Sequence, residues 1–223
     1  MLPAPAVSSQ YSRSTASCPP QRRGLPAWFD RSLAGLGLTI TAPLFLWIAW
    51  RIRREGEGPI FFRQERIGRG GEPFICLKFR SMFPDAEARL SGLLHSDPAL
   101  AEEYARYHKL QNDPRITPFG RFLRRTSLDE LPQLLNVLRG DMALVGPRPL
   151  TAGEIPEYGE LFTWYRSVRP GLTGLWQVSG RSKTTFSERV ALDRRYFETR
   201  SPGLDLLLLL KTLVVVFSRR GAC

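Results

Sequence analysis

The chain has 223 residues, enough for one or two domains with a sizeable core, and carries a formal net charge of +11. This excess favours an anionic partner such as a phosphorylated substrate, anionic lipid or nucleic acid. Three scattered cysteines and two distant histidines lack metal-ligand spacing, so the sequence predicts neither a disulfide framework nor a zinc site.

Residues 1–27 are rich in Ser, Pro and Ala and are predicted to form a disordered tail. The uncharged stretch that follows, SLAGLGLTITAPLFLWIAW at 32–50, comes too late for a signal peptide but is long enough to cross a bilayer as a helix. Arginines flank it on both sides, so the positive-inside rule assigns both ends to the cytoplasm, which a straight span cannot satisfy.

Pro43, near the middle of this stretch, can break a helix. We therefore predict a re-entrant membrane helix over 28–54, which enters the bilayer and returns to the same face. A straight span is the open alternative. Trp47 and Trp50 beside an arginine cluster form an interfacial pattern, which disfavours a buried soluble helix.

The next two apolar stretches, PIFFRQERIG and PFICLKFRSM, flank a glycine turn and predict a β-hairpin. Residues 85–110 have a highly charged helical pattern. Residues 112–125 read as a loop that gives way to a basic helical turn, in which Arg121, Arg124 and Arg125 would share one face.

The segment TSLDELPQLLNV, residues 126–137, places Asp129 and Glu130 directly after two arginines. Leucines at helical spacing predict an amphipathic helix here. Ser127 with Glu130 fits a capping box, whereas Asp129 as the cap would place Pro132 harmlessly in the first turn. Both alternatives put the acids at a helix N-terminus, where they are common for structural reasons alone.

A chemical role is the competing interpretation of the two acids. A helix start favours bound phosphate and keeps a carboxylate ionised. An ionised aspartate is a nucleophile toward phosphorus, provided that a divalent cation and arginines offset the charge of a diphosphate. Arginine-bearing loops could supply those arginines, although residues this frequent could equally decorate every surface; these loops lie at 80, 115–125, 148, 169 and 181.

The remaining segments complete the predicted fold class, which is α+β and mostly helical with one β-hairpin. Residues 140–150 and 168–181 are Gly- and Pro-rich loops, and 188–197 predict a short helix. The apolar stretch 204–220 is short for a span and predicts a helix lying on the membrane or packed in the core. Neither a Walker-type nor a Rossmann glycine motif is present.

Four motifs in one order resemble the bacterial sugar transferases, which are monotopic phosphoglycosyl transferases: KFRSM (78–82), GRFLRRTSLDELPQLLNVLRGDMALVGPRP (120–149), VRPGLTGLWQVSGR (168–181) and ALDRRYF (191–197). The resemblance runs from about Trp28 to Arg220. It implies transfer of a hexose-1-phosphate from a UDP-sugar to undecaprenyl phosphate, with release of UMP, as the first step of exopolysaccharide or O-antigen synthesis. Larger members carry extra N-terminal transmembrane helices, so this chain looks like a minimal version.

The resemblance also implies the site residues. Asp129 is expected to attack the β-phosphate, forming a phosphosugar-aspartyl intermediate, and to bind Mg²⁺, with Glu130 in a supporting catalytic role. Arg124 is expected to hold substrate phosphate. Four further positions match family motifs and are expected to belong to the pocket: Lys78, Arg80, Arg148 and Asp193.

Residues 55–223 are thus predicted to form the catalytic domain, anchored to the cytoplasmic face of the bacterial inner membrane by the re-entrant helix and interfacial amphipathic helices. The expected partners are UDP-galactose or UDP-glucose, undecaprenyl phosphate and membrane lipid, with a homodimer left open. One alternative keeps the chemistry with a UDP-N-acetylhexosamine donor, a second is a non-enzymatic basic nucleic-acid-binding module, and a third is a catalytically dead scaffold. Relatives often have Ser-Pro at the helix break, where this chain has Ala42-Pro43.

Overall fold

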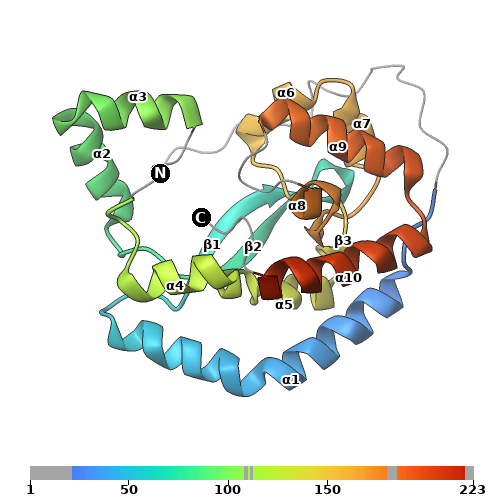
Figure 1. The fold of residues 1–223 in the computed structure, drawn as a ribbon, viewed down its shortest axis with the longest axis horizontal. Coiled ribbons are helices and arrows are strands. Elements are labelled where there is room, and N and C mark those ends of the chain that lie inside the picture. The colour runs from blue at the N-terminus through green and yellow to red at the C-terminus, as the bar shows by residue number, and fades with distance from the viewer. Residues whose placement is uncertain (1–21, 108–109, 111–112, 180–184, 219–223) are drawn as a thin grey trace.

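The computed structural model describes residues 22–107, 110, 113–179 and 185–218. Its described part is mostly helical, with one antiparallel hairpin, as predicted (Figure 1). Most of the tail predicted over 1–27 lies outside the described residues. The α-helices are α1 (Ala27–Arg54), α2 (Ala86–Ser96), α3 (Pro98–Tyr107), α4 (Pro118–Thr126), α5 (Gln133–Arg139), α6 (Ile155–Tyr158), α7 (Leu161–Tyr165), α8 (Leu175–Ser179), α9 (Phe186–Thr199) and α10 (Pro202–Ser218).

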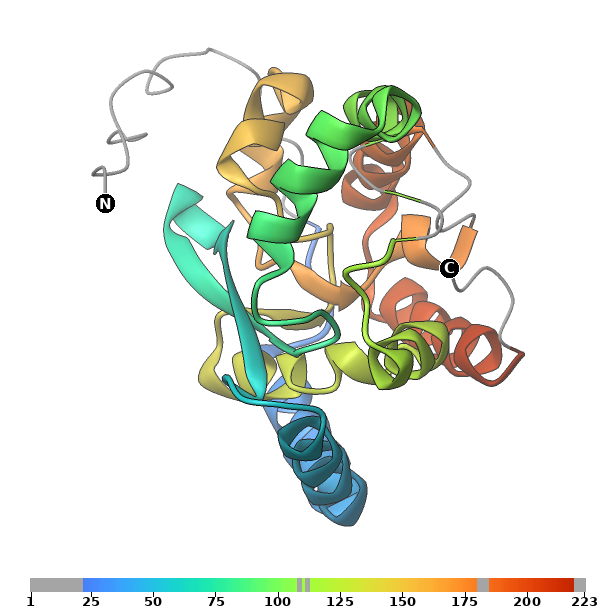
Figure 2. The ribbon, with the colours of Figure 1, turned by 90° about the vertical axis from the view of Figure 1, so that its left-hand side faces the viewer.

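Helix α1 is long and apolar enough to cross a membrane, and it bends near its middle, where Pro43 lies (Figure 1). Thr39 and Thr41 donate hydrogen bonds to the carbonyls of Gly35 and Gly37, a pattern that bends helices. Figure 2 shows α1 protruding from the rest of the molecule, so much of its apolar surface is exposed.

The predicted hairpin is confirmed. Strands β1 (Phe61–Ile67) and β2 (Pro73–Phe79) pair antiparallel, from Phe61 opposite Phe79 to Ile67 opposite Pro73. The glycine turn between them is the 3-10 segment η1 (Arg69–Gly71), in which Gly70 has φ 80°. Side chains from both strands line the pocket described below, among them Gln64 and Arg66 of β1 and Lys78 of β2.

A second pair of strands was not predicted. β3 (Ala143–Val145) and β4 (Gly171–Thr173) pair in parallel inside the two segments that the sequence indicated to be loops. Each strand has only three residues, too few to show a periodic pattern. Gly146 and Gly171 approach so closely that a Cβ on Gly171 would collide with the backbone of Gly146. Glycine at this position therefore permits the pairing.

Within its described residues the charged region 85–110 is mostly helical, as predicted, but it contains two helices. Helix α2 ends at Ser96 and α3 begins at Pro98, because proline cannot continue a helix yet fits its first turn. Helices α9 and α10 confirm the predictions for 188–197 and 204–220 within the described residues. Helix α10 buries Leu208 and leaves Leu210 and Val214 more than half exposed.

Two hydrophobic clusters hold these elements together. The larger cluster joins β3, α6, α7, α9 and α10 to the end of the hairpin, around Tyr165 and Tyr196. The smaller cluster packs the C-terminal half of α1 against β2 and α4; its buried members are Ile48, Ile52, Phe79, Phe119 and Leu123. Helix α1 is thus fastened to the domain along part of its length, and the pocket lies between the two clusters.

Candidate active site

The two acids lie in a 3-10 turn, η2 (Leu128–Glu130), between α4 and α5. Ser127 ends α4 in the left-handed conformation, with φ 58°, and its side chain makes no capping hydrogen bond. The predicted capping box is therefore wrong, and so is a continuous amphipathic helix from Leu128. The left-handed turn at Ser127 redirects the chain, and Pro132 delays the start of α5 to Gln133.

Lys78, on β2, faces the acids from the hairpin. Its Nζ lies 2.7 Å from Glu130 Oε1. Burial and the neighbouring Glu130 carboxylate raise the pKa of Asp129 to about 6, although Lys78 and Arg124 act in the opposite direction. Burial alone would lower the pKa of Lys78, but the charges of Glu130 and Asp129 outweigh it and raise that pKa. The structure thus brings together one lysine and two carboxylates.

Arg124 lines the same pocket from α4, and its Nε donates to Ser81 Oγ at 2.9 Å. The other two arginines of this helix, Arg121 and Arg125, are exposed. Of the three arginines predicted to share one helical face, only Arg124 therefore lines the pocket. Its burial lowers the pKa of the guanidinium, while the charge of Asp129 raises it. A half-buried cation near a carboxylate is suited to binding a substrate phosphate.

Arg80 lines the pocket, but its guanidinium is occupied elsewhere. It donates to the carbonyls of Glu57, Ile52 and Gly56, at 2.9, 3.2 and 3.2 Å. Ile52 lies in the last turn of α1, and Gly56 and Glu57 follow shortly after its end at Arg54. These contacts attach the end of α1 to the hairpin, and the expected binding of phosphate by Arg80 stays a prediction.

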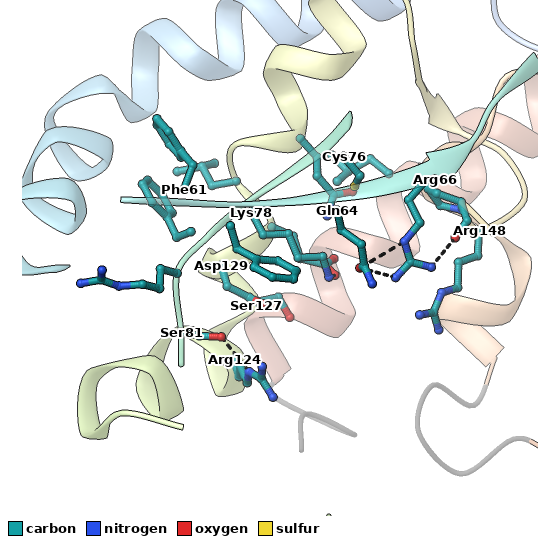
Figure 3. A pocket seen from close by; sticks show the side chains of 18 of the residues that line it. Phe61, Gln64, Arg66, Cys76, Lys78, Ser81, Arg124, Ser127, Asp129 and Arg148 are labelled. Carbon is teal, nitrogen blue, oxygen red and sulfur yellow. Dashed lines mark hydrogen bonds and ion pairs between the residues drawn. The ribbon is translucent and has the colours of Figure 1, made fainter. Parts of the chain in front are cut away.

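Arg148 lines the pocket at the opposite end from Asp129, with Gln64 and Arg66 between them (Figure 3). Asp193, by contrast, does not line it. Asp193 is buried and accepts a 2.6 Å hydrogen bond from the Tyr158 hydroxyl. Burial raises the pKa of Asp193 to about 7, against the lowering effects of Tyr158 and Arg148. Asp193 also accepts a hydrogen bond from the backbone of Arg148, so it contacts a pocket residue without lining the pocket, and its expected part in the site stays a prediction.

The remaining arginine loops diverge. Arg115 lines the pocket and is paired with Asp113, at 2.6 Å. Arg169 is paired instead with Asp30 of α1, at 2.7 Å. Arg181 lies outside the described residues. Some of these arginines therefore line the pocket, whereas Arg169 pairs with an acidic residue elsewhere.

Gln64 and Arg66 also line the pocket, although no motif in the sequence pointed to them. Arg66 Nη2 donates to Gln64 Oε1 at 2.6 Å, and Nη1 donates to the carbonyl of Pro149 at 3.0 Å. Both residues belong to the strand pattern of β1, and two-residue alternation was their only available signal. Arg66 therefore ties the hairpin to the loop that carries Arg148.

The described residues contain no group of three or more His, Cys, Asp or Glu side chains that could hold a metal ion by themselves. Magnesium typically keeps several waters and binds through one or two carboxylates together with substrate phosphates. Asp129 offers such a carboxylate, whereas Glu130 is already paired with Lys78. The residues therefore fit a cation shared between Asp129 and a bound diphosphate.

The family model of the bacterial sugar transferases matches residues 21–219. The chain belongs to the bacterial sugar transferase family. This match covers both clusters, the pocket and all of α1. It thus supports the resemblance drawn from the four sequence motifs.

Three relatives illustrate the range of lengths in the family. The undecaprenyl-phosphate galactose phosphotransferase of Salmonella typhimurium is 44% identical over 90% of this chain, and the match spans 42% of that protein. The UDP-glucose:undecaprenyl-phosphate glucose-1-phosphate transferase of Xanthomonas campestris is 40% identical over 86% of this chain, and the match spans 39% of that relative. The exopolysaccharide production protein ExoY of Sinorhizobium fredii is 44% identical, with 87% and 86% covered. The chain therefore spans less than half of the first two relatives and most of the third.

Proposed function

We propose that this sugar transferase moves a hexose-1-phosphate from a UDP-sugar to undecaprenyl phosphate, with release of UMP. The observation that carries the proposal is the arrangement around Asp129, where one carboxylate lies near the cations of Lys78 and Arg124. Relatives named as galactose- and glucose-phosphate transferases to undecaprenyl phosphate support the substrate class. UDP-galactose and UDP-glucose are therefore the first donors to test.

The proposed reaction has two steps. In the first, a carboxylate oxygen of Asp129 attacks the β-phosphorus of the donor, and the bond from that phosphorus to the bridging oxygen breaks, so UMP departs. In the second, a phosphate oxygen of the lipid acceptor attacks the same phosphorus and the bond to Asp129 breaks. The products are a lipid diphosphate sugar and a regenerated carboxylate. Neither step requires an oxidant or a reductant.

The chain's own residues have distinct parts in this scheme. Lys78 and Arg124 offset the negative charge of the diphosphate, so that an anionic nucleophile can approach it. Glu130 holds Lys78 in position through their ion pair. Asp129 would also hold Mg²⁺, which would neutralise charge on the transferred phosphate. Because the pKa of Asp129 is about 6, most of this side chain is ionised at neutral pH, as a nucleophile requires.

We also propose that α1 is a re-entrant membrane helix and that the domain lies on the cytoplasmic face of the inner membrane. Support comes from the arginines at both ends of α1, from its bend near Pro43 and from its exposed apolar surface. The leucines exposed on α10 add apolar surface, and the basic charge favours anionic lipid. This location suits a reaction between a lipid phosphate and a water-soluble nucleotide.

The two main alternatives differ in what now supports them. A UDP-N-acetylhexosamine donor would use the same residues, and comparing UMP release across donors separates it from the hexose donors. The nucleic-acid-binding module has no support in the family match, which covers residues 21–219. The intact Asp129-Glu130 pair beside Lys78 also disfavours a catalytically dead scaffold.

The decisive experiment is mass spectrometry of the detergent-purified protein given UDP-galactose or UDP-glucose and Mg²⁺ without lipid. We expect a hexose-phosphate adduct on Asp129 that disappears when undecaprenyl phosphate is added. Asp129→Asn should form no adduct, whereas Glu198→Gln, an exposed carboxylate on α9, should form it normally. UMP release only in the presence of lipid, without any adduct, would replace the covalent intermediate with direct transfer.

A further inference from the structure

Two buried polar atoms in the pocket wall lack partners. Trp176 and Gln177, neighbours on α8, both line the pocket. Among the described residues, neither Trp176 Nε1 nor Gln177 Oε1 has a hydrogen-bond partner. Leaving a buried polar group without a hydrogen bond is destabilising, so native proteins rarely do so without a reason. Trp176 Nε1 is a hydrogen-bond donor and Gln177 Oε1 an acceptor, a combination that suits a ligand with both a carbonyl and an N–H group.

Two arginines lie near the ring of Trp176. The guanidinium of Arg148 lies 5.6 Å from the centroid of the Trp176 ring, and that of Arg189 lies 4.9 Å from it. They come from the loop after β3 and from α9. Burial lowers the pKa of Arg189, and the like charge of Arg148 lowers it further. Two cations held near each other on one aromatic ring favour a bound anion.

We propose that Trp176, Gln177, Arg148 and Arg189 form the subsite for the UMP half of the donor. The indole N–H donates to a uracil carbonyl, the Gln177 carbonyl accepts from the uracil imide N–H, and the two guanidiniums face the nucleotide phosphate. This inference rests on the proposed function and specifies which part of the substrate each end of the pocket binds. The hexose-phosphate half then lies at Lys78 and Asp129.

The chemistry of the bases explains the choice of uracil. Uracil presents a carbonyl acceptor next to an N–H donor on its pairing edge, whereas cytosine presents an amino donor next to a ring-nitrogen acceptor. A site with Trp176 as donor and Gln177 as acceptor matches the first edge and opposes the second. A site built to hydrogen-bond one partner strongly rejects an analogue that leaves its polar groups unpaired. Discrimination between UMP and CMP is therefore the diagnostic property.

The test compares UMP and CMP binding by calorimetry in the full-length protein and in two variants. Trp176→Phe removes the N–H but keeps an aromatic ring for the arginines, and Gln177→Met removes the amide with little change of volume. We expect each variant to bind UMP about 10- to 100-fold more weakly, with CMP affinity changed less than about threefold. At saturating UDP-galactose the Asp129 adduct should still form, so KM should rise more than kcat falls.

Trp164→Phe is the matched control, because Trp164 has Arg194 near its ring and does not line the pocket. It should bind UMP as the wild type does. Unchanged UMP affinity in both test variants would overturn the inference. A higher KM for UDP-galactose without weaker UMP binding would also overturn the inference, because Trp176 Nε1 and Gln177 Oε1 would then face the sugar. UMP binding needs no catalysis, so a failure of the proposed reaction, seen as no wild-type adduct, is distinguishable from a failure of this subsite.

Discussion

At the scale of single residues, the ionised form of Asp129 is unfavourable in its folded environment. Burial and the like charge of Glu130 oppose its ionisation, and the two nearby cations only partly compensate. A folded-state pKa of about 6 means that this carboxyl binds its proton more tightly in the folded protein than in the unfolded chain. Such sites commonly exchange stability for function.

We therefore expect Asp129→Asn to stabilise the protein at pH 7.5. A raised folded pKa makes the wild type lose stability as pH rises from about 4 through about 6, and the asparagine variant lacks this loss. With solvent screening taken into account, the gain should be about 1 kcal/mol, or about 2–4 °C in Tm. Thermal unfolding in EDTA checks this, since EDTA excludes any effect of bound metal.

The pH dependence supplies the control for this variant. The difference in Tm between Asp129→Asn and the wild type should shrink toward zero as the pH is lowered to 4, because both side chains are then neutral. Glu198→Gln, which removes an exposed carboxylate, should show no comparable gain at pH 7.5. A lower Tm for Asp129→Asn at pH 7.5 would contradict the assigned environment of Asp129.

At the scale of elements, the pocket depends on how the hairpin is tied to its neighbours. Asn136 of α5 accepts from the Leu77 amide at 3.0 Å and donates to the Ile75 carbonyl at 2.7 Å, so it fixes β2 beside η2. Arg80 performs the corresponding task at the end of α1. These contacts set the distance between Lys78 on the strand and Glu130 on the turn.

Arg80→Met should therefore affect stability more than substrate binding. Losing hydrogen bonds from a charged group to three carbonyls should lower the free energy of unfolding by about 1–3 kcal/mol. The KM for the UDP-sugar should change less than about twofold, since the guanidinium is already engaged. Arg69→Met, in the exposed hairpin turn, should change neither quantity. A large rise in KM with unchanged stability would restore Arg80 to a phosphate-binding role.

At the scale of the whole molecule, α1 is joined to the domain by a buried ion pair near its N-terminus. Asp30 pairs with Arg169 at 2.7 Å and also accepts from the Leu144 amide at 3.3 Å. Burial raises the pKa of Asp30, although Arg169 acts against this effect. Leu138 and Leu134 of α5 lie beside Gly35 and Gly37 of α1. The N-terminal half of α1 is thus anchored beside β3.

Removing one partner of this pair should be more damaging than removing both. Arg169→Met leaves a buried carboxylate without its cation and should lower the free energy of unfolding by about 3–5 kcal/mol. The double variant with Asp30→Asn should recover part of that loss, measured by denaturant unfolding in detergent. The exposed pair Arg194–Glu198 is the control, and Arg194→Met should cost less than about 1 kcal/mol. Equal losses in the single and double variants would show that packing, rather than charge, holds α1.

The sequence by itself determined the parts of this protein that depend on local pattern or on a long motif. Alternation and a glycine turn predicted the hairpin, and the order of four motifs predicted the family and the nearness of Lys78, Arg124, Asp129 and Glu130. Periodic apolar stretches likewise predicted helices at both ends of the described chain. Each of these signals resides in neighbouring residues or in a recognised spacing.

Other features depend on contacts between residues far apart in the chain, and only the tertiary structure determined them. The left-handed Ser127 replaces a helix cap with a 3-10 turn, and two three-residue strands pair across segments that looked like loops. Arg80 and Asp193 match family positions, yet carbonyls at the end of α1 occupy the first and Tyr158 pairs with the second. A side chain's motif indicates its type and place in the chain, but its partners depend on which distant atoms need charge or hydrogen bonds, and folding alone brings those atoms together.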